Sequence, residues 1–249
     1  MNWRLVELEQ YDAFTNMAID EAVSEAVASG ASPPTMRFYT WKPSAVSIGY
    51  FQSLAEEVDA ERCKAEGVDV VRRRTGGGAV YHDELGEITY SIIAPESIFP
   101  KGIIDSYYSI CGCIIDAFDR LDVEAEFKPI NDITVNGRKI SGNAQTRRGG
   151  VLLQHGTILL DVDVKKMFSF LKVGSEKISD KLIASAEERV TSLKREAPDT
   201  AREQLYSVLK AGFTDGKAFS IGKWSDAELA RAKELAETRY RSKEWNEMR

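Results

Sequence analysis

Hydrophobic residues at helical spacing predict an amphipathic helix near the start of the chain. Ile19, Val23 and Val27 recur every four residues, so their side chains would share one face of a helix. Thr15 stands before this segment, and Gly30 ends it. We therefore expect a buried helical face between these two positions.

Three further amphipathic helices are predicted in the last third of the chain, at 162–173, 201–213 and 225–240. Ser225 and Glu228 have the spacing of a capping box at the start of the last one. No Pro/Gly/Ser-rich linker or internal repeat divides the chain. We expect one domain over 1–249, with a helical C-terminal flank at about 200–249.

Short segments rich in β-branched and aromatic residues lie between these helices and predict strands. Several are joined by connections too short for a crossover helix, so we expect a single sheet. Asn136-Gly137 is a strong two-residue hairpin signal. Strands followed by helices favour an α+β fold. The predicted strands are 35–41, 44–51, 68–74, 79–82, 87–94, 125–130, 132–142 and 151–160.

The three cysteines predict neither a disulfide framework nor a zinc module. Cys63, Cys111 and Cys113 are an odd number and lack the spacing of zinc ligands. Cys111 and Cys113 fall in a further predicted helix at 106–118. Helical positions two apart point in nearly opposite directions, so the pair is poorly placed to bind one metal ion. We interpret these cysteines as packing residues.

Composition and charge exclude several classes of protein. Of 249 residues, 43% are hydrophobic and 29% charged, enough apolar residues for a substantial core. Lys plus Arg number 33 and Asp plus Glu 39, and the net charge of −6 argues against a general nucleic-acid-binding surface. No apolar run approaches the ~18 residues of a membrane span, and the N-terminus lacks the pattern of a signal peptide. We expect a cytoplasmic protein without a membrane or nucleic-acid partner.

The segment RRRTGGGAVYHD, residues 72–83, is the first candidate for chemistry. Three successive glycines, Gly76 to Gly78, lose backbone entropy on folding and add nothing to a core. Close approach of their amides to a phosphate would explain them, and Arg72 to Arg74 add positive charge. The segment is neither a P-loop nor a dinucleotide fingerprint, because it runs into a predicted strand. A hairpin loop with a solvated basic face explains the local features equally well.

The second candidate segment, residues 131–157, is locally basic within an acidic protein. Its Arg138, Lys139, Arg147 and Arg148 are opposed only by Asp132, which predicts an anion site. Lys139 lies in a predicted strand among small residues, where a lysine is uncommon unless it faces solvent or a ligand.

The two histidines, His82 and His155, fall one in each of these segments. Most single histidines are structural, and two without a third ligand do not predict a metal site. We expect both to provide hydrogen bonds that support the site.

At these residues the sequence resembles the lipoate–protein ligase family, within the group of biotin and lipoate ligases and octanoyl transferases. The resemblance implies a class II synthetase-like catalytic domain of α+β type, with a mixed, largely antiparallel sheet flanked by helices. It covers most of the chain, through residues 36–52, 72–83, 131–145, 152–160 and 244–246.

The family chemistry that this resemblance implies has two steps. The carboxylate of lipoate attacks the α-phosphate of ATP, giving lipoyl-adenylate and pyrophosphate. A lysine of a lipoyl domain then attacks the adenylate, forming an amide and releasing AMP. The acceptors would be apo lipoyl domains of 2-oxoacid dehydrogenase complexes or the glycine cleavage H protein. No enzyme nucleophile is needed, because catalysis depends on positioning and on stabilising negative charge.

The resemblance also assigns roles by matching the motifs. Lys139 would be the catalytic residue, contacting carboxyl and phosphate oxygens, and Arg73 would hold phosphate. Asp132, with its neighbour Asn131, could help to place Mg²⁺ or the adenylate. Gly49 and the apolar strand around it would line a slot for the acyl chain. Nucleotide and acyl group would be approached by the backbone of Gly77, Gly78, Ala79, Val80 and Tyr81.

The first alternative is an octanoyl transferase that takes its acyl group from octanoyl-carrier protein through a cysteine thioester. In one subgroup that cysteine precedes the strand corresponding to DITV, where this chain reads EFKPINDI. Without a thiolate at this point a covalent route has no evident nucleophile. The Asn131-Asp132 pair is ligase-like, and we favour the ligase.

The second alternative is a non-catalytic lipoate- or nucleotide-binding subunit. Many bacterial ligases of this family carry a further C-terminal accessory domain, whereas this chain ends shortly after Trp245-Asn246. In some archaeal systems that domain is a separate polypeptide, and this sequence resembles the corresponding large subunit. We therefore expect a small accessory subunit as a partner.

Overall fold

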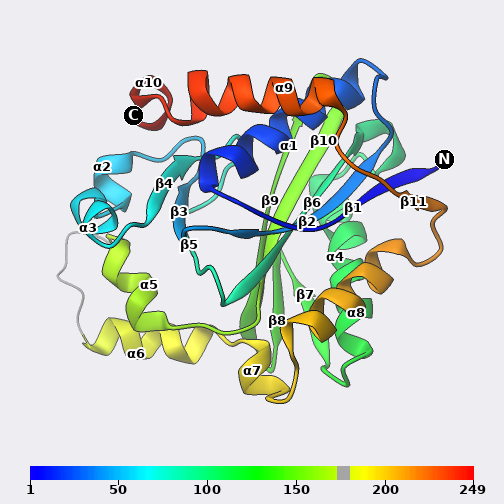
Figure 1. Ribbon diagram of the computed structural model, residues 1–249. Coiled ribbons are helices and arrows are strands. Elements are labelled where there is room, and N and C mark those ends of the chain that lie inside the picture. Colours follow the sequence, from blue (N-terminus) through cyan, green and yellow to red (C-terminus); the bar gives the residue numbers. More distant parts are fainter. Residues whose placement is uncertain (173–179) are drawn as a thin grey trace.

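The computed structural model describes residues 1–172 and 180–249 and contains a large mixed sheet with helices on both faces (Figure 1). The eight strands follow the order β11-β1-β2-β6-β10-β9-β8-β7. β1 pairs in parallel with β11 and β2, and every other neighbouring pair is antiparallel. The expected mixed, largely antiparallel α+β fold is confirmed. The strands are β1 Trp3–Tyr11, β2 Thr35–Trp41, β6 Glu87–Pro95, β7 Ala125–Lys128, β8 Asp132–Val135, β9 Arg138–Arg148, β10 Val151–Leu159 and β11 Phe219–Ile221.

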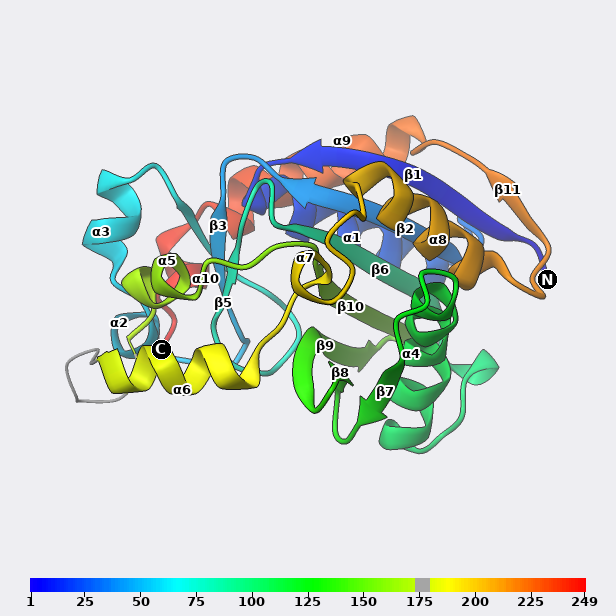
Figure 2. The same cartoon turned by 90° about the horizontal axis from the view of Figure 1, so that it is seen from below.

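The prediction of a single sheet is wrong. Three of the predicted strands form a separate sheet in the order β4-β3-β5, which Figure 2 shows beside the large one. These are β3 Ala45–Ile48, β4 Asp69–Arg72 and β5 Val80–His82. Two short helices, α2 (Leu54–Glu57) and α3 (Ala60–Ala65), link β3 to its parallel neighbour β4. The small sheet buries its own apolar cluster, so it does not need the large sheet's edge.

Two layers of helices cover the large sheet. On one face α4 (Ile103–Asp119) packs with α8 (Arg202–Thr214), and on the other α1 (Ala13–Ala28) packs with α9 (Asp226–Leu235) (Figure 1). Cys111 is buried in the first of these cores, and burial raises the pKa of its thiol to about 12. The interpretation of this cysteine as a packing residue is confirmed.

Several helix boundaries differ from the prediction. α1 begins after Asp12 rather than Thr15, because the Asp12 carboxylate accepts a hydrogen bond from the Thr15 amide at 2.7 Å. The helix predicted at 162–173 is observed as α5 (Val164–Phe170), and its last predicted residue lies outside the described part of the chain. Helical segments that were not predicted are α2, α3, η1 Glu96–Ile98, α6 Asp180–Arg189 and α7 Leu193–Glu196. The helix predicted at 225–240 is observed as α9 followed by the π-helical segment η2 Ala236–Tyr240.

Two local signals are confirmed in detail. Asn136 and Gly137 have φ of 51° and 72° at the turn between β8 and β9, as a two-residue hairpin requires. Ser225 and Glu228 form the reciprocal capping box of α9. The strand β11 interrupts the C-terminal flank that was expected to be helical.

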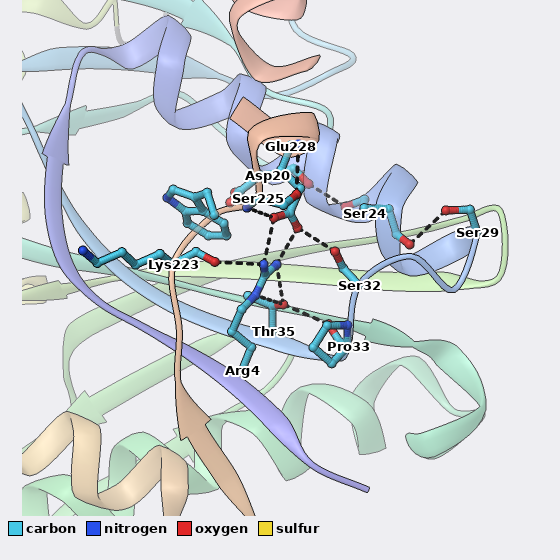
Figure 3. A network of polar contacts seen from close by, with 12 residues as sticks. Arg4, Asp20, Ser24, Ser29, Ser32, Pro33, Thr35, Lys223, Ser225 and Glu228 are labelled. Atoms are coloured by element: carbon cyan, nitrogen blue, oxygen red, sulfur yellow. Dashed lines mark hydrogen bonds and ion pairs between the residues drawn. The ribbon is translucent and has the colours of Figure 1, made fainter. Parts of the chain in front are cut away.

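Glu228 also ties α9 to β1, the strand next to the edge of the large sheet. Figure 3 shows the Arg4 guanidinium of β1 between this carboxylate and the Thr35 hydroxyl, with Ser32 as a further donor to the carboxylate. Burial raises the pKa of Glu228, but hydrogen bonds from Arg4, the Ser225 amide and Ser32 outweigh it and lower the pKa to about 2. The C-terminal helix is thus held by a buried ionic contact as well as by apolar packing.

In the described part of the chain, no helix is both long enough and apolar enough to cross a bilayer.

Candidate functional site

A cavity of about 300 Å³ is lined by residues of both sheets. The large sheet contributes from β2, β6, β9 and β10, and the small sheet from β3, β5 and the glycine-rich loop, which we define as Gly76 to Gly78. Ten predicted site residues line it. They are Arg73, Gly77, Gly78, Ala79, Val80, Tyr81, His82, Asn131, Lys139 and His155.

The floor of the cavity is one row of residues across the large sheet. Tyr39 pairs with Thr89, Thr89 with Thr157, and Thr157 with Gly142, in register across β2, β6, β10 and β9. Three strand spacings of about 4.8 Å give a floor of about 14 Å. Lys139 lies over the far end, because a Cβ on Gly142 would stand 2.8 Å from its Nζ. Apolar side chains share the lining, among them Met17, Trp41, Leu159, Met167 and Val190.

The glycine-rich loop forms part of the opposite wall. Gly77 has φ of +96°, a conformation that residues with a Cβ rarely adopt. Gly49 does not line the cavity. A Cβ at Gly49 would overlap the carbonyl oxygen of Gly77, so the two backbones touch. Gly49 is thus placed to support the loop, rather than to form the acyl slot as expected.

Arg73 is turned inward and holds the loop together. Its guanidinium donates to the carbonyls of Gly76 and Gly78 at 2.8 and 2.7 Å, and to the carbonyl and hydroxyl of Ser47. Burial lowers the pKa of Arg73 to about 10. Its hydrogen bonds shape the loop whose backbone faces the cavity.

The neighbouring arginines point away from the cavity and anchor the C-terminal helices. Arg72 donates to three carbonyls in residues 49–52 and to those of Trp245 and Asn246 in α10 (Lys243–Asn246). Arg74 pairs with Glu21 of α1 at 3.1 Å. Of the three arginines predicted to favour phosphate, only Arg73 reaches the cavity. The other two meet partners that lie far away in sequence.

Lys139 brings a second positive charge to the cavity beside that of Arg73, and it is paired with a carboxylate. Its Nζ lies 2.7 Å from Asp132 Oδ1, and the lysine side chain keeps 42% of its exposure. Asp132 Oδ1 is buried beneath this ammonium, and Asp132 does not line the cavity. The pair holds Lys139 in place while leaving its ammonium accessible.

The other basic residues of this segment are engaged elsewhere. Arg138 pairs with Glu196 at 2.7 Å, Arg147 donates to two carbonyls near η1, and Arg148 lies over the Tyr50 ring. Of the four basic residues predicted to form an anion site in this segment, only Lys139 lines the cavity.

The described residues include no cluster of three or more His, Cys, Asp or Glu side chains that would enclose a metal ion. A Mg²⁺ ion that arrives on a nucleotide needs only one or two protein carboxylates, because phosphates and water fill its other positions. Asp132, which lies next to Lys139, would be the carboxylate for that limited role.

His82 is buried in a chain of polar contacts. Its Nδ1 lies 2.8 Å from Glu87 Oε1 and its Nε2 2.8 Å from Ser47 Oγ. The ring stacks on Trp41 at 4.0 Å between centroids. The expectation that His82 supports the site through hydrogen bonds agrees with this geometry.

His155 has the same kind of environment on β10. Its Nδ1 lies 3.1 Å from Asp20 Oδ2, and its Nε2 lies 2.7 Å from Thr75 Oγ1. Asp20 also pairs with the buried Arg37 and accepts from Ser91. Burial lowers the pKa of His155, although Asp20 opposes this effect.

Asn131 lines the cavity beside Lys139, and its amide group donates to the carbonyl of Asn143. Asn143 returns a hydrogen bond to the Asn131 carbonyl at 2.9 Å and accepts one from the Tyr90 hydroxyl at 2.6 Å. This pair fixes the turn into β8, on which Asp132 lies.

The sequence did not reveal the row of residues that forms the cavity floor, nor the buried carboxylate of Asp20 that contacts His155. Tyr39, Thr89 and Thr157 lie within predicted strands, but which strands are neighbours was unknown, so their alignment was not visible. Asp20 carried one signal that could have been used, because an acidic residue stood beside the predicted apolar face of the first helix. In the described structure none of the three cysteines lines the cavity.

Comparison with known proteins gives two sets of similarities. The family model described as "Lipoyl protein ligase A/B catalytic domain" matches residues 12–214. Octanoyltransferase LipM of Brevibacillus brevis is 36% identical over 98% of both chains. A bipartite lipoate protein ligase of Thermoplasma acidophilum, solved in a study of its lipoylation system, superposes with a TM-score of 0.88 at 30% identity, covering 99% of this chain and 96% of that one. A lipoate-protein ligase A bound with ATP gives 0.85 at 28% identity, covering 99% and 98%.

Proposed function

Because the chain belongs to the family of lipoyl protein ligase A/B catalytic domains, we propose that it ligates lipoate to a lysine of lipoyl domains with consumption of ATP. The reaction would pass through lipoyl-adenylate and release pyrophosphate and then AMP. The acceptors would be apo lipoyl domains of 2-oxoacid dehydrogenase complexes or the glycine cleavage H protein. A cytoplasmic location goes with this proposal.

One observation carries the choice of an ATP-dependent route: Lys139 reaches the cavity and no cysteine of the described structure does. Burial raises the pKa of Cys63 to about 11 and that of Cys111 to about 12, which suppresses the thiolate needed for a thioester. An acyl-adenylate needs no enzyme nucleophile. It needs a cation beside the reacting oxygens, which Lys139 supplies.

The cavity suits an eight-carbon acyl chain with its carboxyl group at the lysine. Eight carbons joined by bonds of about 1.5 Å extend to about 10 Å, which is shorter than the floor of about 14 Å between Tyr39 and Gly142. In this pose the carboxylate would lie beside Lys139, and the tail would run over Thr157 and Thr89 towards Trp41.

The remaining assignments follow from this pose. Lys139 would contact the carboxyl and α-phosphate oxygens in both steps. The glycine-rich loop and Ala79 to Tyr81 would approach nucleotide and acyl group through their backbone. Arg73 would act on phosphate mainly through the loop that it shapes. Mg²⁺ bound to ATP would take at most one carboxylate, that of Asp132.

Octanoyl transfer from octanoyl-carrier protein is the second candidate, and the sequence relatives favour it. The curated relatives with 33–37% identity bear the name octanoyltransferase LipM, whereas the solved ligases have 28–30% identity. A transferase would work without ATP and would need a thiol, and none of the three cysteines lines the cavity of the described structure.

The deciding experiment supplies the purified chain with an apo lipoyl domain and either lipoate plus MgATP or octanoyl-carrier protein without ATP. Mass spectrometry of the lipoyl domain reads the product. We expect ATP-dependent lipoylation that survives replacement of Cys63, Cys111 and Cys113 by alanine, with folding checked by circular dichroism. ATP-independent octanoylation that is lost in one cysteine variant would establish the transferase instead.

We also propose that adenylate formation depends on a separate small accessory subunit. The Thermoplasma acidophilum ligase, described as bipartite, supports this. Lipoylation from lipoate and ATP should rise on addition of the candidate subunit, whereas transfer from chemically made lipoyl-adenylate should not need it. Failure to transfer from the adenylate would favour a non-catalytic binding subunit.

A further inference from the structure

Two chains of polar contacts with the same chemistry connect the large sheet and α1 to the glycine-rich loop. Each runs from a carboxylate through a histidine to a hydroxyl. A carboxylate only accepts hydrogen bonds, so the Nδ1 atoms of His82 and His155 carry the protons. Each Nε2 then lies within hydrogen-bond distance of a hydroxyl, that of Ser47 or that of Thr75.

The two hydroxyls lie at the points that hold the glycine-rich loop. Thr75 directly precedes Gly76, and its carbonyl also accepts from the Tyr50 amide at 2.8 Å. Ser47 presents both its hydroxyl and its carbonyl to Arg73, at 3.1 and 3.0 Å. Arg73 in turn holds two loop carbonyls. The contacts through His155 therefore fix the start of the loop, and the contacts through His82 fix Arg73, which spans the loop.

The loop needs this support because it has no side chains of its own. Glycine has more conformational freedom to lose than any other residue, and Gly76 and Gly78 have open space at their Cβ positions. If only a fraction of the molecules has the loop conformation that binds the ligand, the apparent affinity is reduced to that fraction of the intrinsic affinity. Contacts from outside must therefore raise that fraction.

We propose that Thr75 and Ser47 are positioning residues, which act together with His155 and His82 to hold the glycine-rich loop in the conformation that binds the nucleotide phosphates. That the ordered loop binds nucleotide phosphates rests on the proposed function, whereas the ordering of the loop by Thr75 and Ser47 does not. Neither hydroxyl is placed as a nucleophile. Thr75 is fully buried, and the Ser47 hydroxyl accepts from the Arg73 guanidinium and lies 2.8 Å from His82 Nε2.

Hydrogen exchange of the unliganded protein tests loop order without any assumption about the reaction. Thr75→Val removes the hydroxyl and keeps the shape of the side chain. Ser47→Ala removes the hydroxyl from the other series of polar contacts, the one through His82. We expect each to raise amide exchange at residues 76–80 about ten-fold, which corresponds to about 1.4 kcal/mol. Thr75→Ser should restore the wild-type rate. The matched control is Thr214→Val, because that hydroxyl donates to the Lys210 carbonyl in α8, on the other face of the sheet.

Steady-state kinetics tests the consequence for nucleotide binding. A positioning role predicts that Thr75→Val raises KM for ATP about ten-fold with kcat within about two-fold, because saturating ATP selects the competent loop. A nucleophile would instead show loss of kcat and labelling of Ser47 or Thr75 by a fluorophosphonate, and that would overturn the proposal.

Hydrogen exchange and the lipoylation assay together distinguish failure of the positioning role from failure of the proposed ligase function. Unchanged exchange in both Thr75→Val and Ser47→Ala would contradict the positioning role whether or not the protein is a ligase. Raised exchange in a protein that shows no ATP-dependent lipoylation would support the positioning role and contradict the ligase. If Thr75→Val does not fold, Ser47→Ala alone decides.

Discussion

Lys139 Nζ lies 2.7 Å from Asp132 Oδ1 across the hairpin of β8 and β9, with the ammonium half-exposed at the cavity. The turn at Asn136-Gly137 sets the pairing of Thr134 with Lys139, and a register shift between Ile133 and Thr134 sets the alignment at Asp132. An exposed pair of this kind adds little to stability. The pair matters because it holds the Lys139 ammonium at the cavity.

Replacing Lys139 with Ala should lower the rate of lipoyl-adenylate formation by about 100-fold or more, because one electrostatic contact to the developing charge is lost. The assay is lipoate-dependent release of pyrophosphate. The far-ultraviolet circular dichroism and the urea midpoint should stay at wild-type values. Arg138→Ala is the matched control, because Arg138 lies next in the same strand and pairs with Glu196 outside the cavity. Robust adenylation by the Lys139 variant would remove this residue from the mechanism.

Gly49→Ala should be far more damaging than Gly76→Ala. A methyl group at Gly49 would overlap the Gly77 carbonyl, and overpacking against backbone costs about 1–3 kcal/mol. Gly76 has open space at the same position, and its replacement should be neutral or slightly stabilising, since alanine reduces the entropy of the unfolded chain. Urea unfolding of the two variants measures the difference. Equal stabilities would mean that the contact between Gly49 and the loop does not persist in solution.

The stability of the protein should fall as the pH is lowered below 6.5, the ordinary pKa of histidine, partly because of His155. Burial, Arg73 and His82 lower the pKa of His155, while Asp20 opposes them. The unfolded chain therefore binds a proton at a higher pH than the folded one. Stability from the neutral imidazole is complete above pH 6.5 and is lost as the pH falls towards the lowered pKa.

Urea unfolding at a series of pH values, with His155→Gln for comparison, measures this effect. The variant should show a shallower loss of stability below pH 6.5 than the wild type. Identical slopes in the two proteins would show that His155 does not contribute to the pH dependence.

Asn246→Ala should destabilise the protein by about 1–3 kcal/mol, because it leaves a buried backbone donor without an acceptor. Asn246 Oδ1 accepts from the Arg72 amide at 2.7 Å, and Arg72 also holds the carbonyls of residues 49–52 beside the loop. Urea unfolding checks the change, with the exposed Glu244→Ala in the same helix as the control. Equal effects of the two substitutions would show that the contact with Arg72 contributes nothing.

Much of the secondary structure could be predicted because its causes are local. The apolar spacing of α1, the capping box at Ser225 and the turn at Asn136 each depend on residues within about four positions of one another. The strand β1 was missed because Arg4 and Glu7 break the apolar pattern, and their partners, Glu228 and Lys210, lie in the C-terminal third.

The candidate site could be predicted in part. The glycines and Lys139 stand out by residue type alone, and the structure brings them to one cavity. Nothing in the run Arg72 to Arg74 distinguishes the arginine that shapes the loop from its two neighbours. Only the positions of Gly78, Trp245 and Glu21 in space make that distinction.

The sequence by itself determined the α+β class, most helices and strands, and the residue types from which a phosphate and acyl site could be built. The tertiary structure decided that the strands divide into two sheets, and that Tyr39, Thr89, Thr157 and Gly142 align as one floor. It also decided that His155 meets Thr75, 80 residues away. The reason is physical: periodicity and turns express interactions between chain neighbours, whereas strand order and buried polar pairs depend on the packing of the whole chain.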